Sequence, residues 1–201
     1  MCYLSATSEL GLHMWMGGDA NLKVVTMCDA DHAGCPTSSR STTGACSYLV
    51  GPSTCALISW KSRRQGCCAV STAEAETVAL SETTRADFLP LVDLASHVLD
   101  RDVSGYLGSD SSACVAAVEK GVSAALRFIR KVHRVSLAML HDVFQNQSVH
   151  LKHISGTENV SDIMTKPLTA PRFAELRRAV CVSMPFDPAL DTPAILMKLS
   201  V

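Results

Sequence analysis

The stretch TGACSYLVGPSTCALISWK, residues 43–61, decides the fold. Its two halves, residues 43–50 and 55–61, are rich in strand-forming residues, and the four residues between them are typical of a turn. This spacing predicts an antiparallel hairpin. Upstream, NLKVVTMCD (residues 21–29) predicts another strand, with a carboxylate at its end. We therefore expect three successive strands before the first helix.

Helices and strands alternate after the hairpin. Ser71-Thr72-Ala73-Glu74 is a capping-box pattern, which predicts a helix from residue 71 to about residue 100 with a break at Pro90. Further elements are expected as a strand at 106–110, helices at 111–120 and 126–145, a strand at 149–154, and helices beginning at 161 and near 173. This order predicts an α/β fold, in which a five-stranded mixed sheet (an antiparallel hairpin, then parallel strands) is flanked by helices.

The composition is that of a folded globular protein. Of the 201 residues, 47% are hydrophobic and 18% are charged, and the formal net charge is −1. Because phosphate contacts dominate nucleic-acid affinity, this neutral balance restricts any nucleic-acid contact to local patches. No apolar run approaches the ~20 residues of a membrane span, so we expect no membrane association. The nine cysteines show no metal-ligand spacing and are interpreted as buried thiols in a reducing compartment.

Four acidic residues fall at element ends or on inward helix faces: Asp29, Glu76, Asp110 and Asp162. Asp29 and Asp110 end strands, and the carboxyl ends of parallel strands meet at one rim of a sheet. Clustered carboxylates repel one another unless cations neutralise them, and Mg²⁺ accepts such oxygen ligands. Each residue also has an ordinary structural interpretation, because an Asp at a strand end commonly caps a turn and Asp162 would complement a helix dipole.

Glu74 and Glu76 have different predicted roles. Glu74 is the third residue after Ser71, where its side chain can bond back to the cap. Glu76 shares a helical face with Ala79 and Leu80 and is expected to point toward the sheet. Since an inward carboxylate needs a partner, Glu76 is the better metal ligand of the two.

Two basic clusters are candidates for phosphate contact. The first is formed by Lys61, Arg63 and Arg64. The second follows an i, i+3, i+4, i+7 pattern that would place it on one face of the helix at 126–145, and it comprises Arg127, Arg130, Lys131 and Arg134. A solvated helix face is the alternative interpretation of the second cluster.

Four strings carry a family resemblance. They are CDADHAGCPTSSRSTTGACSYLV (28–50), ISWKSRRQGCCAVSTAEAETVAL (58–80), LGSDSSACVAAVEKG (107–121) and LKHISGTENVSDIMTKPL (151–168). In this order they resemble the ribonuclease H region of copia-type retrotransposon Pol polyproteins, over residues 22–168. Tyr3-Leu4 and Gly11-Leu12 resemble the end of the preceding reverse transcriptase. His32, Thr77 and Ser161 depart from the family pattern, and none of them is a predicted ligand.

The resemblance implies a ribonuclease H fold and hydrolysis of the RNA strand of RNA–DNA hybrids. It assigns a site for two Mg²⁺ ions, with Mn²⁺ as an alternative, to Asp29, Glu76, Asp110 and Asp162. It also suggests that His153 assists product release, with a half-buried strand histidine as the other interpretation. The expected segments are a reverse-transcriptase tail (1–20), the ribonuclease H domain (21–168) and a C-terminal appendage (169–201). The expected partners are the hybrid and a reverse-transcriptase domain of the same polyprotein, and the expected location is the cytoplasm, with a virus-like particle or the nucleus as alternatives.

Two other functions compete with this one. The neutral charge and the missing polymerase favour a non-catalytic nucleic-acid-binding or structural remnant of a truncated polyprotein, whereas the complete set of carboxylates opposes it. An integrase-like strand-transfer enzyme would need a late Glu, but here the Glu is early and the late acid is Asp162.

Overall fold

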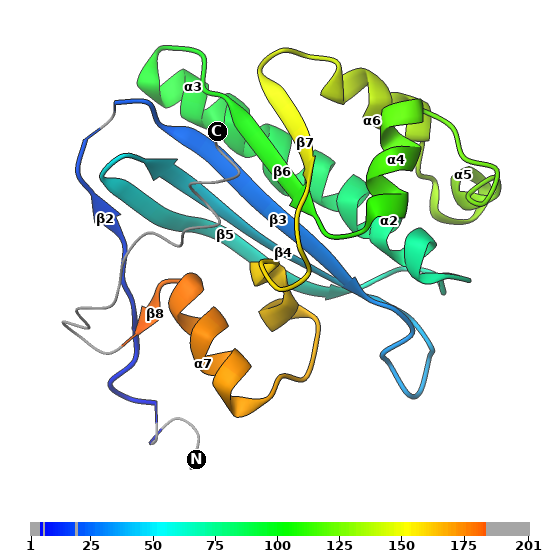
Figure 1. Ribbon diagram of the computed structural model, residues 1–201, viewed down its shortest axis with the longest axis horizontal. Helices are drawn as coiled ribbons and strands as arrows, with labels where there is room; N and C mark the ends of the chain where they lie inside the picture. The colour runs from blue at the N-terminus through cyan, green and yellow to red at the C-terminus, as the bar shows by residue number, and fades with distance from the viewer. Residues whose placement is uncertain (1–4, 6, 19, 184–201) are drawn as a thin grey trace.

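In the computed structural model, which describes residues 5, 7–18 and 20–183, helices pack on both faces of a mixed sheet (Figure 1). The strand order is β2-β5-β4-β3-β6-β7; β2, β5, β4 and β3 are antiparallel neighbours, and β6 and β7 run parallel to β3. The strands are β2 (Trp15–Met16), β3 (Lys23–Asp31), β4 (Thr42–Gly51), β5 (Thr54–Arg64), β6 (Gly105–Ser109) and β7 (Val149–His153). The predicted mixed sheet, an antiparallel hairpin followed by parallel strands and flanked by helices, is therefore confirmed, with β2 as an added edge strand.

Each face of the sheet has its own hydrophobic core. The helices are α2 (Thr72–Thr83), η1 (Thr84–Phe88), α3 (Leu89–Leu99), α4 (Ser112–Lys120), α5 (Ile129–His133), α6 (Leu137–Phe144), η2 (Val160–Met164) and α7 (Ala170–Ala179). Leu80 and Leu107 belong to the core beneath α2 to α6, whereas Met27 and Tyr48 belong to the core beneath η2 and α7. Since β3 contributes to both cores, its residues are buried on both faces, as expected of a central strand.

The segment after residue 168 packs against the sheet through α7. The hydroxyl of Tyr48 in β4 donates a hydrogen bond to the carbonyl oxygen of Ala179 at 3.0 Å. Beyond α7, β8 (Val182–Ser183) pairs with β1 (Gly11–Leu12), so that segments from both ends of the described chain lie side by side (Figure 1). The domain boundaries at residues 20 and 168 remain predictions, and residues 1–4, 6, 19 and 184–201 lie outside the described part of the chain.

Two predicted helices differ from the structure. The helix expected at 126–145 is wrong as one element: α5 ends at His133, Arg134 has a left-handed backbone (φ 58°), and Ser136 accepts a hydrogen bond from the Met139 N–H to cap α6. The break expected at Pro90 is also wrong. The π-helical turn η1 precedes Pro90, which lies in the first turn of α3, and the helix continues to Leu99.

Among the helices formed by the described residues, none is both long and apolar enough to cross a membrane. The eight cysteines of the described residues are free; Cys67 and Cys68 are exposed, and the other six are buried.

Gly44 allows η2 to lie directly on β4. A Cβ added at this position would lie 2.5 Å from Cγ2 of Thr165, 2.9 Å from Cβ of Met164 and 3.1 Å from the carbonyl oxygen of Ser161. The absence of a side chain at residue 44 is therefore a condition for the close packing of η2, which carries Asp162.

We predict that Gly44→Ala lowers the free energy of unfolding by roughly 1–3 kcal/mol, because the added methyl group must push η2 away from the sheet. Gly66→Ala is the control, since a Cβ at Gly66 meets no atom within 4 Å, and its effect should stay within about 0.5 kcal/mol. Urea unfolding measures both. Equal stability of the two variants would contradict the packing described for η2.

Candidate active site

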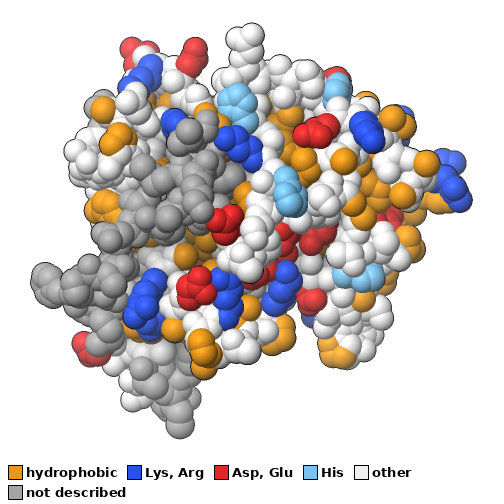
Figure 2. Space-filling view, in the orientation of Figure 1, with side chains coloured by type: hydrophobic (Ala, Val, Ile, Leu, Met, Phe, Trp, Pro, Cys, Tyr) orange, Lys and Arg blue, Asp and Glu red, His pale blue; other side chains and the backbone are white. Residues whose placement is uncertain are grey.

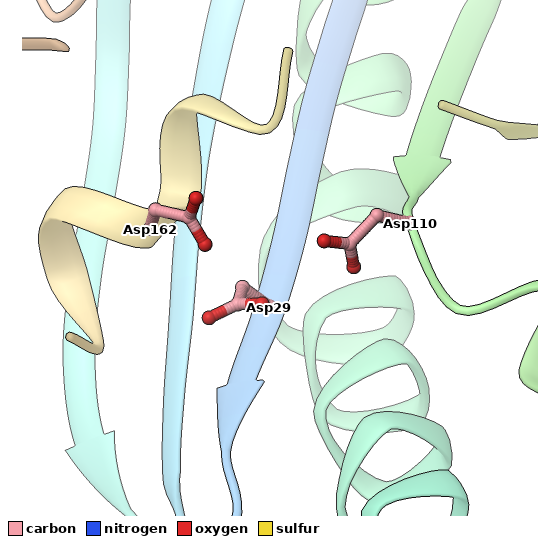
Figure 3. A group of neighbouring side chains, drawn as sticks. All are labelled: Asp29, Asp110 and Asp162. Carbon is pink, nitrogen blue, oxygen red and sulfur yellow. The ribbon is translucent and has the colours of Figure 1, made fainter. Parts of the chain in front are cut away.

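Three carboxylates meet at one edge of the sheet (Figure 3). Asp29 lies in β3 and is completely buried, Asp110 directly follows β6, and Asp162 lies in η2. An oxygen atom of each side chain lies within 4.8 Å of an oxygen of the other two. The parallel register pairs Cys28 with Ser109, so the next residues along the two strands, Asp29 and Asp110, are neighbours. In Figure 3, Asp110 and Asp162 approach Asp29 from opposite sides.

Asn159 fixes the position of η2, and sequence reasoning did not identify it. Its side-chain oxygen accepts hydrogen bonds from the backbone N–H and the hydroxyl of Ser161, at 3.1 and 2.8 Å. Its side-chain nitrogen donates to the carbonyl oxygen of Cys28 at 3.1 Å. Because Cys28 immediately precedes Asp29, this buried amide ties the beginning of η2 to the strand that carries Asp29. The signal was available, since Asn is a preferred N-cap residue.

Glu76 lies in α2 and is buried near Asp29 and Asp110, but it is not one of the three residues whose carboxylate oxygens lie within 4.8 Å of one another. Its side chain is 5% exposed, and no hydrogen-bond partner is found for its Oε2 atom among the described residues. Burial, followed by the charges of Asp29 and Asp110, raises the pKa of Glu76 to about 8. Glu76 is therefore held near the cluster in an environment that disfavours its ionised form.

Glu74 has structural partners. One of its carboxylate oxygens accepts a hydrogen bond from the Val70 N–H at 2.8 Å, and its own N–H donates to the Ser71 hydroxyl at 3.2 Å. The second oxygen lies 3.4 Å from Nε2 of His133 in α5. These contacts join the beginning of α2 to the preceding loop and to α5.

Lys166 and Thr165 contact the cluster, and both were missed by sequence reasoning. The ammonium of Lys166 donates to Oδ1 of Asp29 at 3.0 Å and to Oδ1 of Asp162 at 2.6 Å. The hydroxyl of Thr165 donates to Oδ2 of Asp29. The i, i+4 spacing of Asp162 and Lys166 was the available signal, whereas the contact with Asp29 spans the whole domain and has no local signal.

Burial dominates the electrostatics of Asp29. It raises the pKa of Asp29 even though Thr165 and Lys166 stabilise the carboxylate. For Lys166, burial alone would lower the pKa, but its bonds to Asp162 and Asp29 outweigh burial and raise it. The site therefore holds more acidic groups than its resident cation stabilises in the charged form, a property typical of functional sites.

The remaining predicted residues lie around this cluster. His153 ends β7, is exposed, and has Nε2 3.1 Å from the backbone oxygen of Asp110. Lys61 forms an ion pair with Asp87. The other basic residues are exposed, either at the end of β5 or around α5, and are Arg63, Arg64, Arg127, Arg130, Lys131 and Arg134. The prediction that the last four share one continuous helical face is wrong, because α5 covers only Ile129–His133. In the view of Figure 2, carboxylate atoms appear near the centre of the face, with Lys and Arg side chains close to them.

Comparisons with known proteins identify relatives of the sequence. The chain is 31% identical over 160 residues to the retrovirus-related Pol polyprotein from transposon TNT 1-94 of Nicotiana tabacum, over 78% of this chain and 11% of that polyprotein. It is 38% identical over 81 residues to an uncharacterized mitochondrial protein of Arabidopsis thaliana, over 40% of this chain and 31% of that protein. The chain thus spans less than a third of either relative. The predicted resemblance to a retrotransposon Pol polyprotein is confirmed.

No protein-family profile matches the chain. Among solved structures, ribonuclease H1 from the archaeon Halobacterium salinarum aligns with 71% of this chain and 94% of its own chain, at 14% identity and a TM-score of 0.44.

The raised pKa of Glu76 predicts how stability depends on pH in the metal-free protein. Its folded-state pKa of about 8 exceeds the value of 4.5 for an unperturbed Glu, so the unfolded chain releases this proton first. The contribution to stability is therefore present below about pH 4.5 and is lost as the pH rises toward 8. With a chelator present, the free energy of unfolding should fall over this range by up to ~1.4 kcal/mol per pH unit for this proton.

Glu76→Gln should remove this part of the slope. Urea unfolding at several pH values between 5 and 8 measures the effect in both proteins. The raised pKa of Asp29 acts in the same direction and is retained in the variant, so some slope remains. Identical slopes for the two proteins would show that Glu76 is not buried beside Asp29 and Asp110.

Proposed function

We propose that this chain is a ribonuclease H, an endonuclease that hydrolyses the RNA strand of RNA–DNA hybrids with the aid of two divalent cations. The observation that carries the proposal is the convergence of Asp29, Asp110 and Asp162, from β3, the end of β6 and η2, on one edge of the sheet, where the charges of Asp29 and Asp110 also act on the buried Glu76 of α2. The similarity to a retrotransposon Pol polyprotein supports it, because such an element copies RNA into DNA and so generates the hybrid. The reverse-transcriptase domain of the same polyprotein is the proposed partner.

The residues present fit a divalent cation. The site consists of hard oxygen ligands, the Oε2 atom of Glu76 is buried without a hydrogen-bond partner among the described residues, and a cationic group already lies on Asp29 and Asp162. We infer that Asp29, Glu76, Asp110 and Asp162 would hold Mg²⁺, or Mn²⁺ in its place. When bound, such ions supply an activated water and neutralise charge on the phosphodiester.

The protein contributes positioning and charge. The backbone of Asp29 is fixed by the register of β3 with β4 and β6, and Asn159 ties the beginning of η2, which carries Asp162, to β3, so both residues are held at this edge of the sheet before substrate arrives. Glu76 needs a nearby positive charge to become ionised at neutral pH, because its pKa is raised to about 8. His153 is exposed next to Asp110, where we propose that it assists product release.

The hybrid would be held by phosphate contacts from the two basic clusters. Arg63 and Arg64 end β5, and their backbone pairs with Thr43 and Thr42 of β4, the strand on which η2 lies. The cluster around α5 is exposed and is joined to the beginning of α2 by Glu74 and His133. Such contacts read the backbone and groove shape rather than base sequence.

A non-catalytic nucleic-acid-binding remnant is the second candidate function. The observation that favours it is the pairing of Lys166 with Asp29 and Asp162, which partly neutralises the cluster without any added cation. A remnant of this kind would bind a hybrid through its basic residues but would not cleave it. The two functions therefore differ in hybrid cleavage, which can be measured directly.

We predict that the full chain cleaves the RNA strand of a labelled hybrid with Mg²⁺, and that EDTA stops cleavage. Asp29→Asn and Asp110→Asn should each lower the rate by at least roughly 100-fold, since each removes a proposed ligand, while the fold is retained. Glu74→Gln is the matched control, because it removes an acidic side chain of the same helix as Glu76 and should cleave at close to the wild-type rate. Hybrid binding without cleavage by the wild-type chain would establish the remnant instead.

A further inference from the structure

Lys166 occupies the carboxylate cluster in a specific way. Its ammonium bridges Asp29 and Asp162, at 3.0 and 2.6 Å, while the neighbouring Thr165 hydroxyl bonds the other oxygen of Asp29. Both oxygens of the fully buried Asp29 are thus engaged by adjacent residues of one segment. Asp162 has a second cationic neighbour in Arg172, whose guanidinium lies 3.8 Å from its other oxygen.

The backbone of this segment is fixed, but the lysine side chain can leave. The N–H groups of Thr165 and Lys166 both donate to the carbonyl oxygen of Asp162, at 3.1 and 3.0 Å, and these bonds hold the turn after η2. Pro167 then ends the turn, because it has no N–H to donate. The Lys166 side chain is 39% exposed, so its ammonium can move into solvent without disturbing the turn or the sheet.

We propose that Lys166 is an internal cation, which occupies the carboxylate cluster of the metal-free protein and must be displaced by the divalent ion that binds there. This inference rests on the proposed function of the cluster as a metal site. The ammonium and a divalent ion would use the same oxygens of Asp29 and Asp162 and would repel each other at this distance. Lys166 is thus a positioning residue, which holds Asp29 and Asp162 together before the metal arrives.

Competition between the Lys166 ammonium and the divalent ion sets how far Lys166 lowers the metal affinity. If the ammonium occupies the site about nine-tenths of the time, only about one-tenth of the molecules are ready for the metal, and the apparent affinity falls roughly tenfold. The same contact neutralises Asp29, which has no exposure to water. Lys166 therefore stabilises the metal-free protein and weakens its metal binding, two effects that a residue with only a packing role would not combine.

Calorimetric titration of the full chain with Mn²⁺ tests this proposal. Lys166→Met should bind Mn²⁺ roughly tenfold more tightly than the wild type, whereas Lys166→Arg, which keeps the charge, should stay close to the wild type. Lys152→Met is the control for the lost charge, because the Lys152 ammonium lies 5.0 Å from the centre of the Tyr106 ring and contacts none of the four acids. It should change the affinity much less than Lys166→Met does.

Thermal unfolding provides the second measurement. Without metal, Lys166→Met should unfold at a lower temperature than the wild type, and saturating Mn²⁺ should remove most of the difference. Equal Mn²⁺ affinity of the wild type and Lys166→Met would overturn the role of Lys166 and leave the metal site standing. Absence of Mn²⁺ binding by all the variants would instead overturn the metal site, and this inference with it.

Discussion

Asp29 and Glu76 are carboxylic acids buried close together at one edge of the sheet, where their ionised forms are disfavoured without a cation beside them. The raised pKa values of Asp29 and Glu76 are the direct expression of this constraint. Lys166 compensates for part of the charge through two carboxylates, and the Oε2 atom of Glu76 is left without a hydrogen-bond partner among the described residues. The site is consequently arranged to receive positive charge, which is the property that a phosphodiester-cleaving metal centre requires.

Both faces of the sheet contribute to maintaining this arrangement. The core beneath α2 to α6 fixes the helix that carries Glu76, and the opposite core fixes η2, which carries Asp162. β3 contributes to both cores and carries Asp29, and its register with β6 places Asp29 beside Asp110. Gly44 of β4 pairs with Asp29 of β3. Because Gly44 has no side chain, η2 can also pack directly on β4.

The features that sequence predicted well are those with local, periodic signals. The hairpin at residues 43–61, Asp29 near the end of β3 and Asp110 directly after β6 were identified because alternation and turn chemistry act over a few residues. The helix at 126–145 was predicted wrongly because its apolar spacing continues through Arg134, whereas a left-handed residue and the Ser136 cap divide it. Helix capping depends on hydrogen bonds between a side chain and the nearby backbone, and the spacing of apolar residues does not predict these bonds.

The contacts that sequence could not predict join distant segments. The side chains of Asn159 and Lys166 reach Cys28 and Asp29 across more than 130 positions, and nothing in their neighbouring residues specifies those partners. The meeting of Asp29, Asp110 and Asp162 could therefore be predicted, whereas the groups that orient and neutralise them could not. This difference follows from physical chemistry, since strand order brings the acids together but tertiary packing selects their partners.

Anomalous diffraction from crystals grown with Mn²⁺ tests most directly whether the cluster is a divalent-metal site. We expect manganese bound at the cluster, with ligands from Asp29 and at least one of Glu76, Asp110 and Asp162. A cluster that holds no manganese at millimolar concentration, with Lys166 still bound to Asp29 and Asp162, would contradict this expectation.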